Sequence, residues 1–511
     1  MRQTDALIAS IFIASGATAQ EPLSAIDWLD APVSVSVAAP RVVPLDDMAV
    51  SDGVDTPEVA VMPLGSARSD SVGLLPANVT GLPVSLWQAS TERAVTAQFA
   101  RLAPEPLPAI QALYYTLLLA EAEAPADAGA GAGFLKARLA ALERFGAVDP
   151  ALALIERAGP ATPALFDRWL DLALLVGTED TPCKALADNP SLSQRYGARI
   201  FCTARAGDWQ TAALLYETAL ALDLLSATEG DLLAQFLDPD MVENSHALAP
   251  ASDMTPLLFR LYESVGEPLP TQGLPRAYAM ADLRPSSGWK ARIDAAERLT
   301  RTGALPPNRL LGLYTERSPA ASGGVWARVA AMQAFDAALT NGQPDAIATA
   351  LSEVWRLMRE QRLSVSFAEL YGKDLASLDG LPGPARALAL RISLLSPEYE
   401  TAAQGANPDD PAEAFLAGLA RGAPPEKLAD TPLKQAVARA FDATGPARTH
   451  AGMLEGDKLG QAILTAALQL DQAGPRGFDD ISNSLATLRA VGLEDTARRA
   501  ALQLLILERG T

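Results

Sequence analysis

The stretch GDWQTAALLYETALAL, residues 207–222, is the most regular pattern in the chain and decides the fold class. After Gly207, small or bulky apolar residues follow at fixed intervals, as Ala212, Tyr216 and Ala219. These intervals place the three side chains along one face of an α-helix. A small residue lets two helices approach closely, and a bulky one fills the groove of the neighbour. The stretch therefore predicts a helix that packs against a second helix.

The same spacing occurs elsewhere, since Gly146 is followed by Ala151, Ile155 and Ala158. Asp208 and Trp209 add a polar-aromatic pair after the glycine. The pattern resembles the tetratricopeptide repeat, a 34-residue helix-turn-helix unit. The resemblance implies a TPR-like α-solenoid, and it is carried by a small set of packing residues: Gly146, Ala151, Ala158, Gly207, Trp209, Ala212, Tyr216 and Ala219. An irregular, alanine-rich helical bundle is the alternative.

The chain after about residue 93 is rich in Ala, Leu, Arg and Glu, which are strong helix formers. Gly, Pro and Asp interrupt it at short intervals, and alternating Val, Ile and Thr runs typical of strands do not occur. We therefore expect an all-α fold of antiparallel helix pairs, preceded by a largely non-helical arm. The predicted organisation is a signal peptide (1–19), an extended Pro/Val/Asp-rich arm (20–92), N-terminal repeats (93–245), a Pro/Gly-rich bend (246–286), central repeats (287–405) and C-terminal helices (406–511).

The N-terminus predicts the cellular compartment. Arg2 precedes a short apolar run, residues 6–14, and the small residues of Ala17-Thr18-Ala19 form a cleavage signature. A frayed terminal helix is the alternative. No later segment approaches about 18 uninterrupted apolar residues, so the mature chain is expected to lack a membrane span. A cleaved signal in a Gram-negative cell places the protein in the periplasm.

Two apolar islands lie within the arm. Large apolar groups in an extended arm are costly to leave in water. Residues 72–87 are expected to dock on the helical body of the chain itself. For residues 24–32, whose Ile26, Trp28 and Leu29 could form one amphipathic turn, docking on the body and docking on a partner are both open.

The chain has two cysteines, Cys183 and Cys202. An even count in an oxidising compartment favours a disulfide. The sulfurs could meet if the two helices that carry these residues pack antiparallel across the loop at Asn189-Pro190. Two buried thiols are the alternative.

The sequence offers little chemistry. Its two histidines, His246 and His450, lie in polar contexts that read as surface loops, without a second metal ligand three or four residues away. Asp409-Asp410 and Asp479-Asp480 are explained as helix N-caps. A serine-nucleophile motif and a phosphate-binding loop are also absent from the sequence. We therefore expect no catalytic, cofactor or metal site.

The formal net charge of −20 disfavours nucleic acid as a partner, because phosphates require Lys and Arg. The expected function is a non-enzymatic periplasmic scaffold or adaptor that binds protein on a helical-repeat surface. Alternatives are a chaperone or assembly factor for an envelope machine, such as the flagellar motor or the cell-wall synthesis apparatus, and a structural protein that self-associates through its end helices. A cell-wall enzyme is the least favoured alternative. The oligomeric state stays open.

Overall fold

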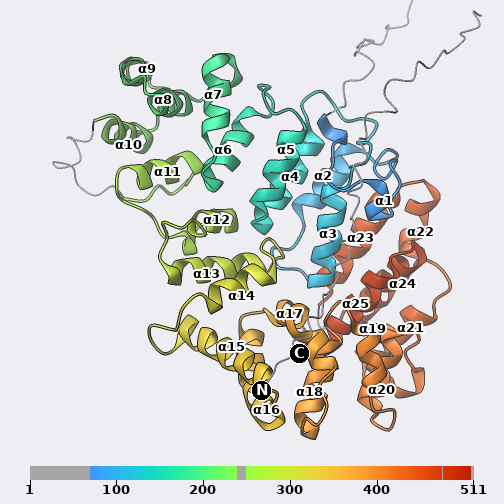
Figure 1. Ribbon diagram of the computed structural model, residues 1–511. Helices are drawn as coiled ribbons and strands as arrows, with labels where there is room; N and C mark the ends of the chain where they lie inside the picture. Colours follow the sequence, from blue (N-terminus) through green and yellow to red (C-terminus); the bar gives the residue numbers. More distant parts are fainter. Residues whose placement is uncertain (1–68, 239–248, 475, 508–511) are drawn as a thin grey trace, which may run out of the picture. The chain divides into compact units, whose positions relative to one another are not determined.

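A computed structural model describes residues 69–238, 249–474 and 476–507, all of which lie in the unit that spans Gly65–Thr511. The predicted signal peptide and the residues Ile26, Trp28, Leu29 and His246 lie outside the described residues. Within the described part of the chain every regular element is helical, apart from an isolated bridge between Leu75 and Ala120. The all-α prediction is confirmed (Figure 1).

The first ten α-helices form before residue 238. Side-chain caps define several of their starts, since Thr91, Asp208 and Ser226 accept hydrogen bonds from the exposed N–H groups of the first turn. The helices are α1 (Ala77–Thr80), α2 (Glu92–Ala100), α3 (Pro108–Leu119), α4 (Gly133–Phe145), α5 (Val148–Arg157), α6 (Phe166–Val176), α7 (Asp180–Asp188), α8 (Tyr196–Arg205), α9 (Trp209–Ala221) and α10 (Ala227–Leu237).

Three of the next eight α-helices begin at proline, whose fixed φ suits the first helical position. They are α11 (Pro256–Ser264), α12 (Ala279–Asp282), α13 (Trp289–Thr300), α14 (Pro307–Thr315), α15 (Gly324–Asn341), α16 (Pro344–Glu360), α17 (Ser364–Ala376) and α18 (Gly383–Ser393).

Seven further α-helices complete the described chain: α19 (Tyr399–Ala402), α20 (Pro411–Ala420), α21 (Pro432–Asp442), α22 (Arg448–Glu455), α23 (Leu459–Gln472), α24 (Phe478–Ala490) and α25 (Glu494–Ile506). The described chain also contains single 3₁₀ turns: η1 (Ser69–Ser71) before α1, and η2 (Pro190–Leu192), η4 (Thr271–Gly273), η5 (Arg276–Tyr278), η6 (Ala403–Gly405) and η7 (Glu426–Leu428) between α-helices.

Helices that follow one another in sequence pack as neighbours. The pairs α8 and α9, α15 and α16, α17 and α18, and α23 and α24 each lie side by side (Figure 1). Gly207 joins α8 to α9 with φ +87°, and Gly146 ends α4 with φ +80°. Only glycine adopts this left-handed conformation without strain, so both positions permit the tight reversal that a helix pair needs.

Residues 72–87 dock on the helical body, as predicted. Trp87 is buried between Phe99 of α2 and Phe134 of α4, with ring centroids 5.6 and 5.9 Å away. The N–H of Gly460 on α23 donates to the carbonyl of Leu86 over 3.1 Å. The segment is therefore held by helices from both ends of the described chain.

Arg138 of α4 holds the start of the same segment through hydrogen bonds to backbone carbonyls. Its guanidinium is buried and donates to the carbonyls of Leu118, Ala120 and Val72, over 2.7, 3.1 and 2.7 Å. Carbonyl oxygens compensate the desolvated charge without an ion pair. One arginine thus joins the end of α3 to the chain before α1.

The last helix returns to one of the first. Helix α25 packs against α3, and α23 contacts both α2 and α3 (Figure 1). The side-chain oxygen of Gln503 accepts from the N–H of Ala109 over 2.9 Å, and Asp471 accepts from the N–H of Leu107 over 3.1 Å. In an open solenoid each repeat contacts only its neighbours in sequence. The sequence did not indicate this contact.

Two local predictions have mixed outcomes. Within the predicted bend, 246–286, Ala277 and Tyr278 of η5 are buried, as are Ala279 and Ala281 of α12. Asp410 caps α20, as expected, by accepting from the N–H groups of Ala412 and Glu413. The capping prediction is wrong for Asp479 and Asp480, because Gly477 holds the cap position and the two aspartates lie within the first turn of α24.

Candidate functional site

Helix α9 carries four of the eight residues that the repeat pattern singled out. Ala212 and Ala219 are fully buried against the neighbouring helices. Tyr216 is half-buried, and its hydroxyl donates to the carbonyl of Gly230 on α10 over 3.2 Å. In the earlier pattern, Ala151 is buried within α5 and Ala158 caps the end of that helix.

The outer side of α9 is unusually apolar. In the described part of the chain seven large hydrophobic side chains are exposed, and five of them belong to α9 and the turn after it. Trp209 is 48% exposed, Leu214 67% and Leu222 61%. We call this group the α9 surface; it consists of Trp209, Leu214, Leu220, Leu222 and Leu224.

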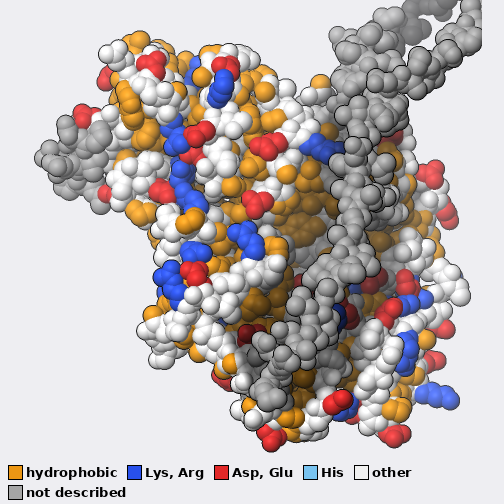
Figure 2. Space-filling view, viewed as in Figure 1, with side chains coloured by type: hydrophobic (Ala, Val, Ile, Leu, Met, Phe, Trp, Pro, Cys, Tyr) orange, Lys and Arg blue, Asp and Glu red, His pale blue; other side chains and the backbone are white. Residues whose placement is uncertain are grey.

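The composition of α9 explains the exposure. Its sequence WQTAALLYETALA contains one charged residue, Glu217. At 100° per residue, Leu214 lies opposite the buried Ala212, while Trp209 and Leu220 lie on one flank and Leu222 on the other. Most surface helices confine apolar residues to one stripe, and a helix that is apolar all round is usually buried. Figure 2 shows hydrophobic side chains on the surface over α8–α10.

The neighbouring helices hold α9 in place. The indole of Trp209 lies 5.9 Å from the ring of Phe236 on α10, measured between centroids. A disulfide joins Cys183 on α7 to Cys202 on α8, which confirms the predicted pairing. The cross-link ties α8, the helix under α9, to the rest of the body. The α9 surface is therefore supported on a fixed pair of helices.

Glu179, at the start of α7, forms ion pairs with Arg205 of α8 and Arg260 of α11. It is buried and accepts from Arg260 over 2.8 Å, while Arg205 lies 3.3 Å away. The two arginines bracket α9 and α10 in sequence, and both direct their charge at this carboxylate. The ion pairs, both to one oxygen of Glu179, link the C-terminal end of α8 and α11 to the start of α7.

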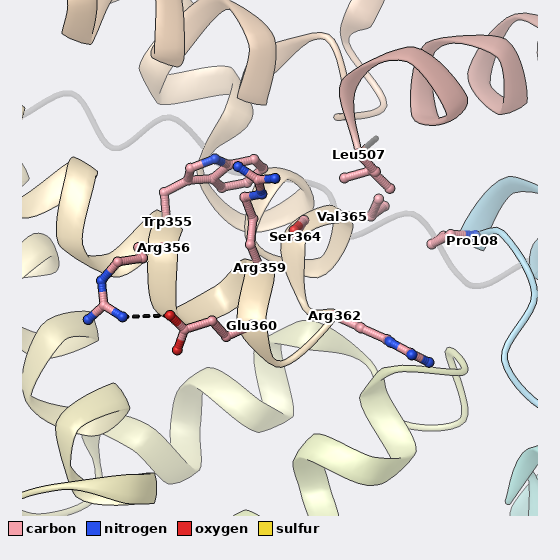
Figure 3. A pocket seen from close by; sticks show the side chains of 9 residues that line it. All are labelled: Pro108, Trp355, Arg356, Arg359, Glu360, Arg362, Ser364, Val365 and Leu507. Atoms are coloured by element: carbon pink, nitrogen blue, oxygen red, sulfur yellow. Dashed lines mark hydrogen bonds and ion pairs between the residues drawn. The ribbon is translucent and has the colours of Figure 1, made fainter. Parts of the chain in front are cut away.

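A cavity of about 490 Å³ lies between α16, α17, α3 and the end of α25 (Figure 3). Arg359 lies beside the indole of Trp355, and Arg362 extends away from both. Arg356 binds Glu360 over 2.6 Å, and Arg362 binds Glu105. Carboxylates thus offset the charge of Arg356 and Arg362.

A second cavity, of about 420 Å³, is lined by α2, α4, α6 and η5 and contains Glu143 and Asp171. Arg168 donates to Glu143 over 2.6 Å, and Arg195 donates to Asp171 over 2.8 Å. Burial raises the pKa of Glu143 to about 7 despite Arg168, and burial also raises the pKa of Asp171. The other oxygen of Glu143 is buried without a hydrogen-bond partner. Both carboxylates thus line the cavity, and each is paired with an arginine.

The prediction that His450 lies in a surface loop is wrong. The residue is on α22 and is buried, with Nδ1 2.8 Å from the hydroxyl of Thr487 on α24. That hydroxyl donates to the carbonyl of Asn483, so the ring nitrogen is the donor to it. Burial lowers the pKa of His450. The histidine serves helix packing, and the polar sequence RTHAGM hid its helix.

The sequence singled out Trp209 as a packing residue but missed Leu214, Leu220, Leu222 and Leu224. The signal was present, because an apolar residue on every side of one helix exceeds what its two neighbours can cover. Among the described residues, no group of His, Cys, Asp and Glu side chains is arranged to hold a metal ion. No described helix is both long and apolar enough to cross a membrane.

Comparisons with known proteins identify no relative: no protein-family model, curated protein or solved structure matches the chain.

Proposed function

We propose that the chain is a non-enzymatic scaffold or adaptor of the bacterial periplasm, built from TPR-like helix pairs, and that the α9 surface binds a protein partner. The observation that carries the proposal is the exposure of Trp209, Leu214 and Leu222 on a helix with one charged residue. Apolar patches of this kind mark interaction sites, because leaving them in water is costly. The disulfide supports the compartment, since such bonds persist in oxidising surroundings.

The test is site-specific photo-cross-linking in living cells. A photoreactive amino acid replaces Leu214, and in a matched control it replaces Val84, which is also exposed and apolar but lies far from α9 in sequence. We expect a discrete protein adduct from position 214 and none of the same size from position 84. Adducts that are identical at both positions, or absent from 214, 220 and 222, would contradict the proposal.

The identity of the adduct separates the two binding roles. A stable structural component of the envelope indicates an adaptor, whereas a subunit caught only during assembly indicates an assembly factor. The enzyme alternative would place its chemistry in the cavity that contains Glu143, so a change of this residue is a control for binding at α9. Glu143→Gln should leave the adduct from position 214 unchanged, because this residue belongs to α4 and α9 lies beyond α8.

A further inference from the structure

The chain around α9 has a one-sided charge. Residues 206–259 contain no Lys or Arg. The same stretch contains nine acidic residues: Asp208, Glu217, Asp223, Glu229, Asp231, Asp238, Asp240, Glu243 and Asp253. In a random mixture of the chain's charges several of these positions would be basic, so the segment is a local acidic block.

Several of these carboxylates surround the α9 surface. Asp208, Glu217, Asp223 and Asp231 are exposed. Glu217 is part of α9, and the hydroxyl of Tyr216 donates to the carbonyl of Gly230, which places the adjacent Asp231 of α10 close to the middle of α9. Asp223 occupies the turn between α9 and α10. The apolar side chains are therefore flanked by negative charge on α9, on α10 and at the connection.

The two arginines that border the acidic block in sequence form their ion pairs elsewhere. Arg205 and Arg260 stand at the two ends of the acidic block, and both lie within ion-pair distance of the buried Glu179. Arg205 also binds Asp180 over 2.7 Å. Exposed acidic groups therefore predominate around the α9 surface, and a cationic partner would be attracted to it.

We propose that the α9 surface binds an amphipathic helix of a partner protein, with bulky apolar side chains on one face and Lys or Arg along its edges; this rests on the proposed function of that surface. Helical surfaces commonly bind such helices through apolar anchors spaced three or four residues apart. The apolar face of the partner helix covers Leu214 and Trp209. Its basic edges lie against Glu217, Asp223 and Asp231.

The acidic residues also argue against two other occupants. A second copy would place its own acidic block against this one, and like charges across an interface are unfavourable. An anionic lipid surface would be repelled for the same reason. A basic amphipathic helix is the occupant that satisfies both the apolar side chains and the charges.

The experiment uses the full chain and three labelled peptides of about 18 residues. One is an amphipathic Leu/Lys helix, one is its Leu/Glu counterpart, and one has the Leu/Lys composition in scrambled order. Fluorescence anisotropy should show that the Leu/Lys helix binds at least tenfold more tightly than either of the others, with an affinity that falls as salt rises.

Two variants assign the binding to the surface. Leu214→Gln should weaken the Leu/Lys helix about tenfold. The triple variant Glu217→Gln, Asp223→Asn, Asp231→Asn should weaken it severalfold and reduce its salt dependence. Asn suits position 223, where φ is +54°. A matched control, Asp442→Asn with Glu455→Gln, removes two exposed carboxylates from α21 and α22 and should leave binding unchanged.

The outcomes separate the inference from the function. Equal binding of the Leu/Lys and Leu/Glu helices, lost in Leu214→Gln, would overturn the charge requirement and leave the protein-binding surface in place. Equal weakening by the control pair would also overturn the inference, because the attraction would then be general. A dimer in sedimentation that Leu214→Gln dissociates would assign the surface to a second copy. Failure of every peptide together with absence of adducts from position 214 would overturn both proposals.

Discussion

Glu143 shows how far the surroundings of one residue can move its protonation. Its carboxylate accepts from Arg168, yet burial dominates and raises its pKa to about 7. A carboxyl whose pKa is raised on folding stabilises the folded state below its unfolded pKa, and the contribution is lost as pH rises through the folded value. The sequence around it, AALERFG, marks a surface position near a helix end. The burial comes from α6 and η5, which no local pattern reveals.

Glu143→Gln should therefore stabilise the protein at alkaline pH. The amide stays neutral, so the variant should gain on the order of 2 kcal/mol over the wild type near pH 8 and little near pH 4.5. The measurement is the melting temperature of both proteins across this range. Glu455→Gln, an exposed substitution on α22, is the control and should follow the wild type. A melting difference that is constant with pH would contradict the assignment.

At the scale of the element, the sequence predicted which segments are helical better than it predicted what covers them. The intervals after Gly207 and the caps at Asp208 and Asp410 are local signals, and they determine α9 and α20 directly. The disulfide partner could be predicted because one short connection separates the two helices involved. The exposure of Leu214 could not, because a periodic pattern shows where apolar residues lie and not whether a neighbour reaches them.

The docked segment 72–87 depends on one close approach between elements. At Gly460, the first turn of α23 lies so near Trp87 that an added Cβ would stand 2.6 Å from the ring and 2.7 Å from the carbonyl of Leu86. Gly460→Ala should therefore displace the segment and lower the stability by about 1–3 kcal/mol, although alanine itself favours helix.

Limited proteolysis near residues 80–90 and the melting temperature measure this effect. Gly312→Ala on α14 is the matched control, because nothing lies within 4 Å of a Cβ there. It should be neutral or mildly stabilising. If Gly460→Ala behaved like Gly312→Ala, the contact between residues 86–87 and α23 would not hold the segment.

At the scale of the whole described chain, the contact between α3 and α25 changes how stability is distributed. In an open array of repeats, the terminal units have one neighbour and fray independently. Here α3 and the last helix, α25, cover each other, so each depends on an element nearly 400 residues away. The sequence shows that both helices are apolar but contains no signal for this pairing, because helix patterns identify buried faces and not their distant partners.

Gln503 provides the test of that dependence. It is buried, and its side-chain oxygen accepts from the N–H of Ala109, one of the first-turn groups of α3 that no helical carbonyl can satisfy. Gln503→Leu keeps a side chain of similar size but leaves the N–H of Ala109 buried without an acceptor. We expect the free energy of unfolding to fall by about 1–3 kcal/mol. Because the loss falls on both helices, hydrogen exchange should accelerate in α3 and α25 together and remain unchanged in α13.

The control is Gln333→Leu on α15, which removes hydrogen bonds to the carbonyls of Tyr314 and Arg317 and should affect only α14 and α15. Acceleration confined to α24 and α25 in the Gln503 variant would mean that the two ends are stable independently, as in an open solenoid.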